Sequence, residues 1–325
     1  MGNIVLSNSG IGSLQTCPFM YYLKNIEDWE MIEKPIYYAV GGAFHTGKEL
    51  IRKEMPLPEA IAEATKVFDD DIDSRALVAA MLSEWYKASR QFYQDYEIVD
   101  VEMKIELPLA EYEGGEIYFA GMADALLKDK NGRLFVGESK TTSDSVDRFC
   151  SKLWAQRQGL LYVWALRRLG YDVVGIIYDV TKKATIKRGM ATPMEKRKYK
   201  KDGETLYAGQ REHDESYSEY LSRLKQWYQS KPESFAQEVI VHSKQQLDAI
   251  ENDMSNILKA LVFYQATDNW PRSLSSCYAY NRACEFAHYC SAGNDELILQ
   301  SLYKKRDRVF SKLINKGETD EFNTN

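Results

Sequence analysis

A short turn between two strand-like segments constrains the fold of this chain more than any other feature. Residues 117–127 and 133–141 read as β-strands, and Asp129-Lys130-Asn131-Gly132-Arg133 lies where they meet. This turn has the form of a three-residue hairpin loop, with Gly132 in the left-handed conformation of a bulge. The loop predicts that Asp129 pairs with Arg133, and it thereby sets the register of the whole hairpin.

Extending this register along the hairpin pairs Asp124 with Glu138. Side chains alternate between the two faces of a strand, so Asp124, Glu138 and Lys140 then share one face. A two-residue Asn-Gly loop would instead place Asp124 and Glu138 on opposite faces. The type of loop therefore decides whether the three side chains lie together.

Two carboxylates and an ammonium group on one face fit a hydrolytic site. Carboxylate oxygens suit Mg²⁺ or Mn²⁺, and such a metal lowers the pKa of a bound water and neutralises charge on a phosphodiester. Lys140 could orient or deprotonate that water and stabilise the developing oxyanion. A cross-strand salt bridge of little energetic value would explain the same residues, and both interpretations stay open.

The other elements surround this hairpin. Helices are predicted from Ser7 or Ser9 to Lys24, from about Val40 through Glu49, and over residues 59–69, 74–96, 146–169, 216–229, 244–265 and 295–315. Further strands are predicted over residues 98–109 and 172–180. The central order of helix, three strands, helix and strand indicates an α/β fold.

Composition narrows the class of protein. The chain has 325 residues, of which 44% are hydrophobic and 28% charged, so it is neither disordered nor fibrous. Its longest apolar runs, such as residues 160–166, fall far short of the roughly 20 residues of a membrane span, and the first residues lack a signal-peptide pattern. We therefore expect an intracellular protein without a membrane partner, whose five cysteines are metal ligands, catalytic groups or buried thiols.

The charge is unevenly distributed. Residues 182–201 contain nine basic residues and one acidic residue, so this segment carries +8 although the whole chain carries −6. Such a segment could bind a polyanion locally. It could equally be a solvated loop.

Five short motifs follow one another along the chain. They are the stretch from Leu6-Ser7 to Cys17-Pro18-Phe19-x-Tyr21-Tyr22, then Gly42-Ala43-Phe44-His45 with Glu49, Gly121-Met122-Ala123-Asp124, Glu138-Ser139-Lys140, and Gln158-x-x-x-Tyr162. In this order they resemble the PD-(D/E)XK nuclease superfamily, and within it the RecB-type branch. The resemblance extends from Leu6 to Cys290, with Ala123 in place of the proline in the family's name.

The resemblance implies a restriction-endonuclease-like mixed sheet flanked by helices and a Mg²⁺- or Mn²⁺-dependent deoxyribonuclease. It implies four metal ligands: His45, Asp124, Glu138 and the backbone carbonyl of Ser139. Lys140 would be the catalytic lysine, while Gln158 and Tyr162, which lie on one face of a helix, would contact DNA or order the site. Alternatively, His45 and Tyr162 are core residues with satisfied polar groups.

Four cysteines form a second candidate site. Cys277, Cys284 and Cys290 follow a C-x6-C-x5-C spacing, and Cys17 lies near the N-terminus. Some RecB-type proteins, including CRISPR-associated adaptation exonucleases and the nuclease domain of AddB, hold a [4Fe-4S] cluster with one early and three late cysteines, more commonly spaced C-x2-C-x5-C. The resemblance implies such a cluster, joining the N- and C-terminal helical parts.

Zn²⁺ is the alternative to this cluster, with His288 able to replace a cysteine. Scattered buried thiols are the third interpretation. Cys150 is predicted to be a structural residue.

We therefore expect one nuclease domain over residues 1–325. It comprises an N-terminal helical part (1–96), a catalytic core (97–181), a basic loop (182–209) and a C-terminal helical and cysteine-cluster part (210–325). The basic loop would contact DNA phosphates through Lys182, Lys183, Lys187, Arg188, Lys196, Arg197 and Lys198.

The expected function is exonucleolytic hydrolysis of phosphodiester bonds at DNA ends in recombination, repair or replication. The setting would be the cytoplasm of a phage host or prokaryote, with a helicase, recombinase or single-strand-binding protein as partner. One alternative is a CRISPR-adaptation-type nuclease that trims spacer precursors. Another is a non-catalytic DNA-binding scaffold that holds an iron–sulfur cluster or zinc.

Overall fold

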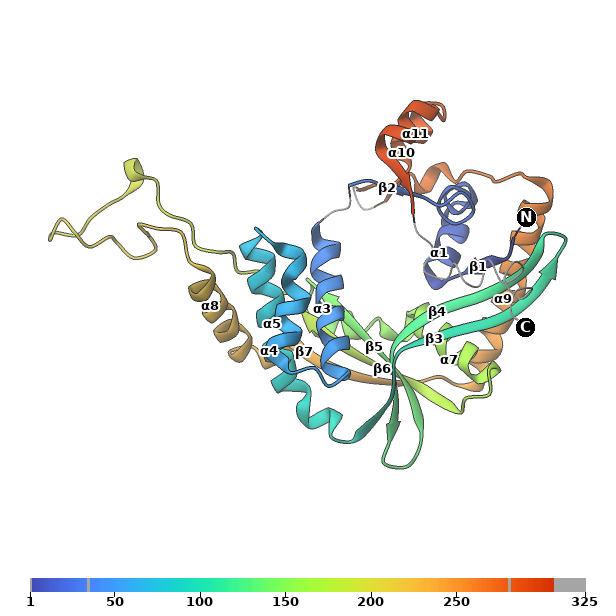
Figure 1. Cartoon of the computed structure of the whole chain (residues 1–325), viewed down its shortest axis with the longest axis horizontal. Coiled ribbons are helices and arrows are strands. Elements are labelled where there is room, and N and C mark those ends of the chain that lie inside the picture. The colour runs from blue at the N-terminus through green and yellow to red at the C-terminus, as the bar shows by residue number, and fades with distance from the viewer. Residues whose placement is uncertain (1, 34–35, 280–281, 307–325) are drawn as a thin grey trace, which may run out of the picture.

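A six-stranded mixed sheet forms the centre of the molecule (Figure 1). The computed structural model describes residues 2–33, 36–279 and 282–306. The sheet order is β1-β4-β5-β6-β7. β1 and β5 pair with different parts of β4, and β3 also pairs with β4. The strands are β1 (Ile4–Leu6), β3 (Tyr96–Tyr112), β4 (Gly115–Asp129), β5 (Leu134–Thr142), β6 (Val173–Lys182) and β7 (Phe235–Val241). The expected α/β fold with a mixed sheet is confirmed.

The hairpin between β4 and β5 has the predicted three-residue loop. The Asp129 amide donates to the Arg133 carbonyl at 3.0 Å, and Gly132 adopts a φ of 80°. The ladder pairs Ala125 with Gly137 and Lys128 with Leu134, which places Asp124 opposite Glu138. The register that puts the two carboxylates on one face is therefore confirmed.

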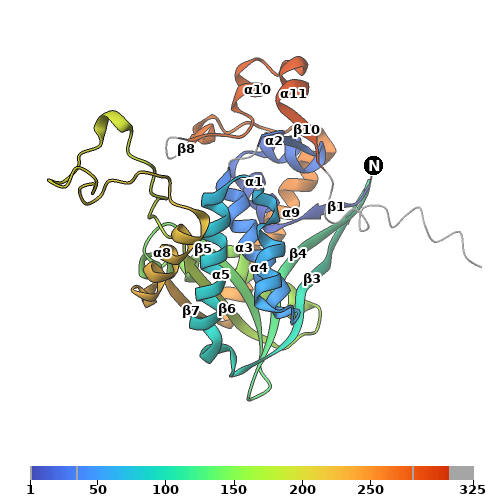
Figure 2. The same ribbon diagram turned by 60° about the vertical axis from the view of Figure 1, so that its left-hand side comes forward.

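Helices cover both faces of the sheet (Figure 2). Ile176 and Val180 of β6 belong to the core beneath α7 (Arg157–Arg168) and α9 (Lys244–Thr267). Asp179, between them in β6, instead contacts α3 (Ile36–Arg52) and α5 (Ile72–Tyr93) on the opposite face. The helices α4 (Leu57–Thr65) and α8 (Tyr217–Gln229) pack with α3 and α5 in a second core.

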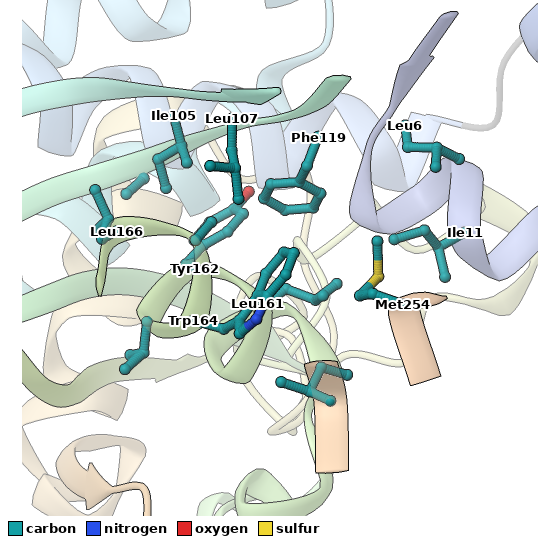
Figure 3. Close-up of a cluster of buried hydrophobic side chains, with 14 of the residues drawn as sticks. Leu6, Ile11, Ile105, Leu107, Phe119, Leu161, Tyr162, Trp164, Leu166 and Met254 are labelled. Carbon is teal, nitrogen blue, oxygen red and sulfur yellow. The ribbon is translucent and has the colours of Figure 1, made fainter. Parts of the chain in front are cut away.

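The larger core holds α7 against the sheet (Figure 3). Leu161, Tyr162 and Trp164 of α7 meet Phe119 of β4, whose ring lies 6.4 Å from that of Tyr162 and 6.1 Å from that of Trp164. Met254 of α9 closes this core. Packing on this scale fixes the rotation of α7, and with it the direction of Gln158.

Two predicted helices are interrupted. The first ends at Cys17, giving α1 (Asn8–Thr16), α2 (Pro18–Tyr21) and a π-helical turn (Tyr22–Ile26), because a residue before proline disfavours the helical conformation. The helix predicted over 146–169 divides into α6 (Val146–Cys150), a 3₁₀ turn (Leu153–Ala155) and α7. Leu153 is buried in the main core, so tertiary packing rather than periodicity fixes this second break.

The C-terminal part folds back onto the N-terminal part. The helix predicted over 295–315 is α11 (Glu296–Leu302), which is followed by β10 (Tyr303–Lys305) in antiparallel pairing with β2 (Trp29–Met31). Residues 307–315 of that prediction lie outside the described residues. The C-terminal part also contains α10 (Ala287–Ser291) and the two-residue strands β8 (Tyr278–Ala279) and β9 (Arg282–Ala283).

The segment between β6 and α8 extends away from the body in both views (Figures 1 and 2). We call residues 183–215 the arm. Its two halves are held together by a bridge between Tyr199 and Leu206. In the described ranges, no helix is both long enough and apolar enough to cross a membrane.

Candidate active site

The β4–β5 hairpin brings the predicted catalytic residues together. The Ser139 amide donates to Asp124 Oδ2 at 2.7 Å, and Lys140 Nζ lies 2.7 Å from Glu138 Oε1. Glu138 is 3% exposed, and Lys140 is partly accessible. Glu138 and Lys140 both lie in β5, so their ion pair is not the cross-strand salt bridge of the alternative interpretation.

Helix α7 adds Gln158 and Tyr162 to the same group. Gln158 Oε1 accepts a hydrogen bond from Lys140 Nζ at 2.7 Å, and Gln158 Nε2 donates to Glu138 Oε1 at 2.8 Å and to the Tyr162 hydroxyl at 3.1 Å. Tyr162 is at once a core aromatic and a member of this network. Gln158 therefore fixes the spacing of Lys140 and Glu138.

Helix α3 supplies His45 from another direction. His45 Nδ1 lies 3.3 Å from Asp124 Oδ2, and its side chain is about one-third exposed. A buried core histidine would be enclosed, so the core interpretation of His45 does not match its position. His45 and Asp124 form an accessible pair beside the buried Glu138.

The two central carboxyl groups have opposite pKa shifts. Burial works against ionising Asp124, but hydrogen bonding to His45, the charge of Arg52 and the Ser139 amide outweigh it and hold the Asp124 pKa below its usual value. Burial and the nearby Asp124 charge raise the pKa of Glu138. Among the described residues, Glu138 Oε2 has no hydrogen-bond partner although it is buried.

Glu102 is a candidate that the sequence analysis missed. It lies in β3 between Val101, which pairs with Ala125, and Met103, which pairs with Ala123, and so faces Asp124 across the ladder. Its φ of 57° is left-handed, which is uncommon for a residue other than glycine. Burial and the charges of Asp124 and Glu49 raise its pKa to about 7. No sequence signal distinguished Glu102 from the other acidic residues of β3.

Lys48 and Arg52 were also missed, although a signal existed. They lie three and seven residues after His45, so the three side chains follow one face of α3. Arg52 Nη1 lies 4.0 Å from Asp124 Oδ2. Two basic residues on the buried face of a helix could have been read as partners of buried acids.

The oxygen-rich donor set fits a hard divalent cation. Glu138 Oε2 has no hydrogen-bond partner among the described residues, and the adjacent Asp124 and the imidazole of His45 offer further donor atoms. Within the ranges that the structure describes, no three His, Cys, Asp or Glu side chains converge closely enough to hold one ion. The candidate ligands lie next to one another, but their donor atoms do not point toward a single position.

The four predicted cluster cysteines surround one small cavity. A space of about 70 Å³ is lined by Cys17, Cys277, Cys284 and Cys290. The Ser273 amide lies 3.5 Å from Cys17 Sγ, and burial raises the pKa of Cys284 and of Cys290. Cys150 lies elsewhere, against the main core. The four cysteines therefore lie together in the fold, and whether they hold a metal group or are free thiols is untested.

The predicted basic loop, residues 182–209, comprises the last residue of β6 and most of the arm. Its root adjoins the site, because Lys182 pairs with Thr142, two residues beyond Lys140, and the Lys183 amide donates to the Thr142 carbonyl. Arg188 is paired with Asp73 at 2.7 Å, and Arg197 donates to backbone carbonyls within the arm. The side chains of Lys187, Lys196 and Lys198 are exposed.

One family of known proteins matches most of this sequence. The sequence matches the family described as the PD-(D/E)XK nuclease superfamily over residues 5–291. No curated protein matches the chain. A solved structure titled "Crystal structure of SSO0001" has 14% sequence identity and a TM-score of 0.32, over 80% of this chain and 88% of that one. The mixed sheet flanked by helices fits the restriction-endonuclease-like fold of the matched family.

Proposed function

Because the chain belongs to the PD-(D/E)XK nuclease superfamily, we propose that it is a Mg²⁺- or Mn²⁺-dependent deoxyribonuclease that degrades DNA from its ends. Its site residues are Asp124, Glu138 and Lys140 on the hairpin, His45 on α3, and Gln158 with Tyr162 on α7. The chain acts as one nuclease domain. The setting is recombination, repair or replication.

The observation that carries this proposal is the unpartnered Glu138 Oε2. An isolated buried carboxylate oxygen is costly, and an approaching cation removes that cost. Four ligands would hold the metal: His45, Asp124, Glu138 and the carbonyl of Ser139. Such an ion lowers the pKa of a bound water and neutralises charge on the scissile phosphate.

The remaining residues position the water and the phosphate. Lys140 Nζ donates to both Glu138 and Gln158, so its ammonium group is held at the edge of the carboxylate pair. There it stabilises the negative charge that develops on the phosphate. Gln158 fixes Lys140 in this place, and the Tyr162 hydroxyl fixes Gln158.

The arm is proposed to bind the DNA backbone. Its root lies beside the hairpin that carries Lys140, and Lys187, Lys196 and Lys198 are free to meet phosphates. Arg188 instead ties the arm to Asp73 of α5, and Arg197 donates to a backbone carbonyl within the arm. Lys182 and Lys183 extend the basic surface toward the catalytic lysine.

The four-cysteine cavity is proposed to hold a [4Fe-4S] cluster, which would assign the chain to the RecB-type branch. Four thiols that line a cavity suit a group with several metal atoms. A single Zn²⁺ bound by the same four sulfurs at about 2.3 Å is the alternative occupant.

The test is digestion of end-labelled linear DNA and closed circular DNA with Mg²⁺ or Mn²⁺. Wild type is compared with Lys140→Met, which removes the ammonium group but keeps most of the stem, and with Glu138→Gln. We expect each substitution to lower the cleavage rate by at least about 100-fold. Circular duplexes should survive, because they have no ends. A triple Lys187, Lys196 and Lys198→Ala variant should show a shallower dependence of DNA affinity on salt concentration.

Equal cleavage by Glu138→Gln and wild type would contradict the assigned site. Cleavage of closed circles at the linear rate would make the enzyme an endonuclease. No cleavage by wild type with either metal would favour a DNA-binding scaffold.

A further inference from the structure

A group of buried charges lies next to the candidate site but outside the proposed catalytic set. Lys48 and Asp179 are both 0% exposed, and Arg52 is 9% exposed. Buried charges are costly unless they are paired and hydrogen-bonded. The contacts of Lys48, Asp179 and Arg52 therefore show which opposite charge each of them is paired with.

Asp179 is fully satisfied without Arg52. Its Oδ2 accepts from Lys48 Nζ at 2.6 Å, Trp85 Nε1 at 2.7 Å and the Tyr93 hydroxyl at 2.8 Å, while Oδ1 accepts from Gln237 Nε2 at 3.0 Å. The Lys48 ammonium also lies 4.4 Å from the centre of the Trp85 ring. The charge of Lys48 is thus matched by Asp179, and Arg52 is left for another acid.

Arg52 reaches from this group to the catalytic hairpin. Its Nη2 lies 3.4 Å from Ser139 Oγ and its Nη1 lies 4.0 Å from Asp124 Oδ2, and it also hydrogen-bonds the Tyr93 hydroxyl. Ser139 pairs with Asp179 in the β5–β6 ladder, so Arg52 lies between the satisfied pair and Asp124. A guanidinium group does not lose its proton in proteins, so this charge is permanent.

The surroundings of Asp124 need such a charge. Glu138 interacts with Asp124, and Glu102 interacts with both Asp124 and Glu49. Several carboxyl groups therefore lie close together: Lys140 pairs with Glu138 and Lys53 with Glu49, while His45 and Arg52 are the basic groups beside Asp124. Without a cation at this place, their mutual repulsion would oppose folding.

We propose that Arg52 is a positioning residue that serves as the resident counter-cation of Asp124 until a divalent metal binds. The idea rests on the proposed metal-dependent function. Before metal binding, Arg52 offsets the repulsion between the carboxylates and holds Asp124 and Ser139 in place. When the metal arrives, the same charge repels it, so Arg52 stabilises the metal-free protein and weakens metal affinity.

The test measures Mn²⁺ binding by calorimetry and thermal unfolding with and without Mn²⁺, both in the absence of DNA. Arg52→Met keeps much of the stem and removes the charge, whereas Arg52→Lys keeps the charge. Arg90→Met is the matched control, because Arg90 lines the same cavity of about 260 Å³ behind Arg52 and is exposed.

For Arg52→Met we expect a lower unfolding temperature without metal, about tenfold tighter Mn²⁺ binding, and a larger rise in unfolding temperature on adding Mn²⁺ than in wild type. Arg52→Lys and Arg90→Met should bind Mn²⁺ with wild-type affinity. If Arg52→Met does not fold without metal, combining it with Asp124→Asn should restore folding, because the unpaired acid is then gone.

Three results would overturn the role of Arg52. The first is an equal loss of unfolding temperature with and without Mn²⁺ at unchanged Mn²⁺ affinity, which makes Arg52 an anchor of α3. The second is a double variant that still does not fold. The third is a wild-type protein that binds no Mn²⁺, which overturns the metal-dependent function as well; binding in wild type separates the two failures.

Discussion

Asp124 and Glu138 show how neighbouring carboxyl groups acquire different properties. They face each other across one hairpin, yet the pKa of Asp124 is lowered and that of Glu138 is raised. The difference arises because His45, Arg52 and the Ser139 amide outweigh the effect of burial at Asp124, whereas burial and the charge of Asp124 raise the pKa of Glu138. Asp124 therefore stays ionised, whereas the charge of Glu138 lacks a full set of partners. This combination suits a site that binds a metal ion.

Glu102 gives a pH dependence with a defined sign. Its pKa in the folded, metal-free protein is about 7, above its unfolded value of about 4.3. Between these values the folded state holds a proton that the unfolded state has lost, so stability falls as pH rises from about 4.5 to about 7. We expect Glu102→Gln to remove this part of the pH dependence in urea unfolding with EDTA present.

The comparison between wild type and Glu102→Gln cancels the titration of other groups, including Glu138. Glu106, also in β3, pairs with Ala120 and so lies farther along the ladder from Asp124, and Glu106→Gln is therefore the matched control. Parallel pH profiles for wild type and Glu102→Gln would show that Glu102 does not titrate in this range.

The packing of α7 against β4 transmits core geometry to the site. Gly121 leaves the space that the Tyr162 ring occupies, since a Cβ there would lie 2.5 Å from Tyr162 Cε1. The ring is held by Phe119 and cannot move freely. The glycine in the Gly121-Met122-Ala123-Asp124 motif thus serves Tyr162, and through it Gln158.

We expect Gly121→Ala to destabilise the protein by about 1–3 kcal/mol, the usual cost of overpacking. The displaced Tyr162 would lose its 3.1 Å bond to Gln158 and loosen Lys140, so the cleavage rate should fall as well. Chemical unfolding and the cleavage assay check both effects.

Gly42→Ala in α3 is the matched control, because a Cβ at that position meets no atom within 4 Å among the described residues. Alanine in a helix should leave stability unchanged or slightly raised. A Gly121→Ala protein as stable as wild type would mean that the ring adapts without strain.

The molecule as a whole is closed by contacts between its two ends. β2 pairs with β10, Lys24 lies 2.6 Å from Glu285, and the Phe19 amide donates to the Pro271 carbonyl. The cysteine cavity lies at the same junction and takes Cys17 from one end and three cysteines from the other. A bound cluster would therefore reinforce a junction that already has protein contacts.

This arrangement predicts that Cys17→Ser loses the visible absorption of an iron–sulfur cluster and unfolds at a lower temperature, yet keeps its fold. Cys150→Ser, outside the cavity, should keep both the absorption and the unfolding temperature. Visible spectra, metal analysis and thermal unfolding of anaerobically purified protein make the comparison. A colourless wild type that carries one zinc per chain would establish the zinc alternative instead.

Local rules predicted the centre of the site. The Asp129–Arg133 loop fixed the register that places Asp124 opposite Glu138, because loop length sets hairpin pairing. Ser7, Ser216 and Ser243 cap α1, α8 and α9, so a capping serine stands at the start of each of these helices. These features depend on residues close in sequence, so they can be predicted from the sequence without the structure.

Local sequence rules could not predict contacts between segments that lie far apart in the chain. β1 has three residues and forms only against β4, more than one hundred positions away. The break before α7 follows from burial of Leu153, and the pairing of Lys48 with Asp179 joins residues 131 positions apart. Glu102 became a candidate only when β3 was placed beside Asp124.

The amino-acid sequence thus specified the hairpin, its three charged residues and the family motifs, since each is encoded within a few neighbouring positions. The environment that gives those residues their charge states arose from packing. Arg52, Glu102 and His45 reach Asp124 from a helix and a strand whose positions are set by two hydrophobic cores. Electrostatic interactions depend on distance in space and on burial, and neither quantity can be read from positions along a chain.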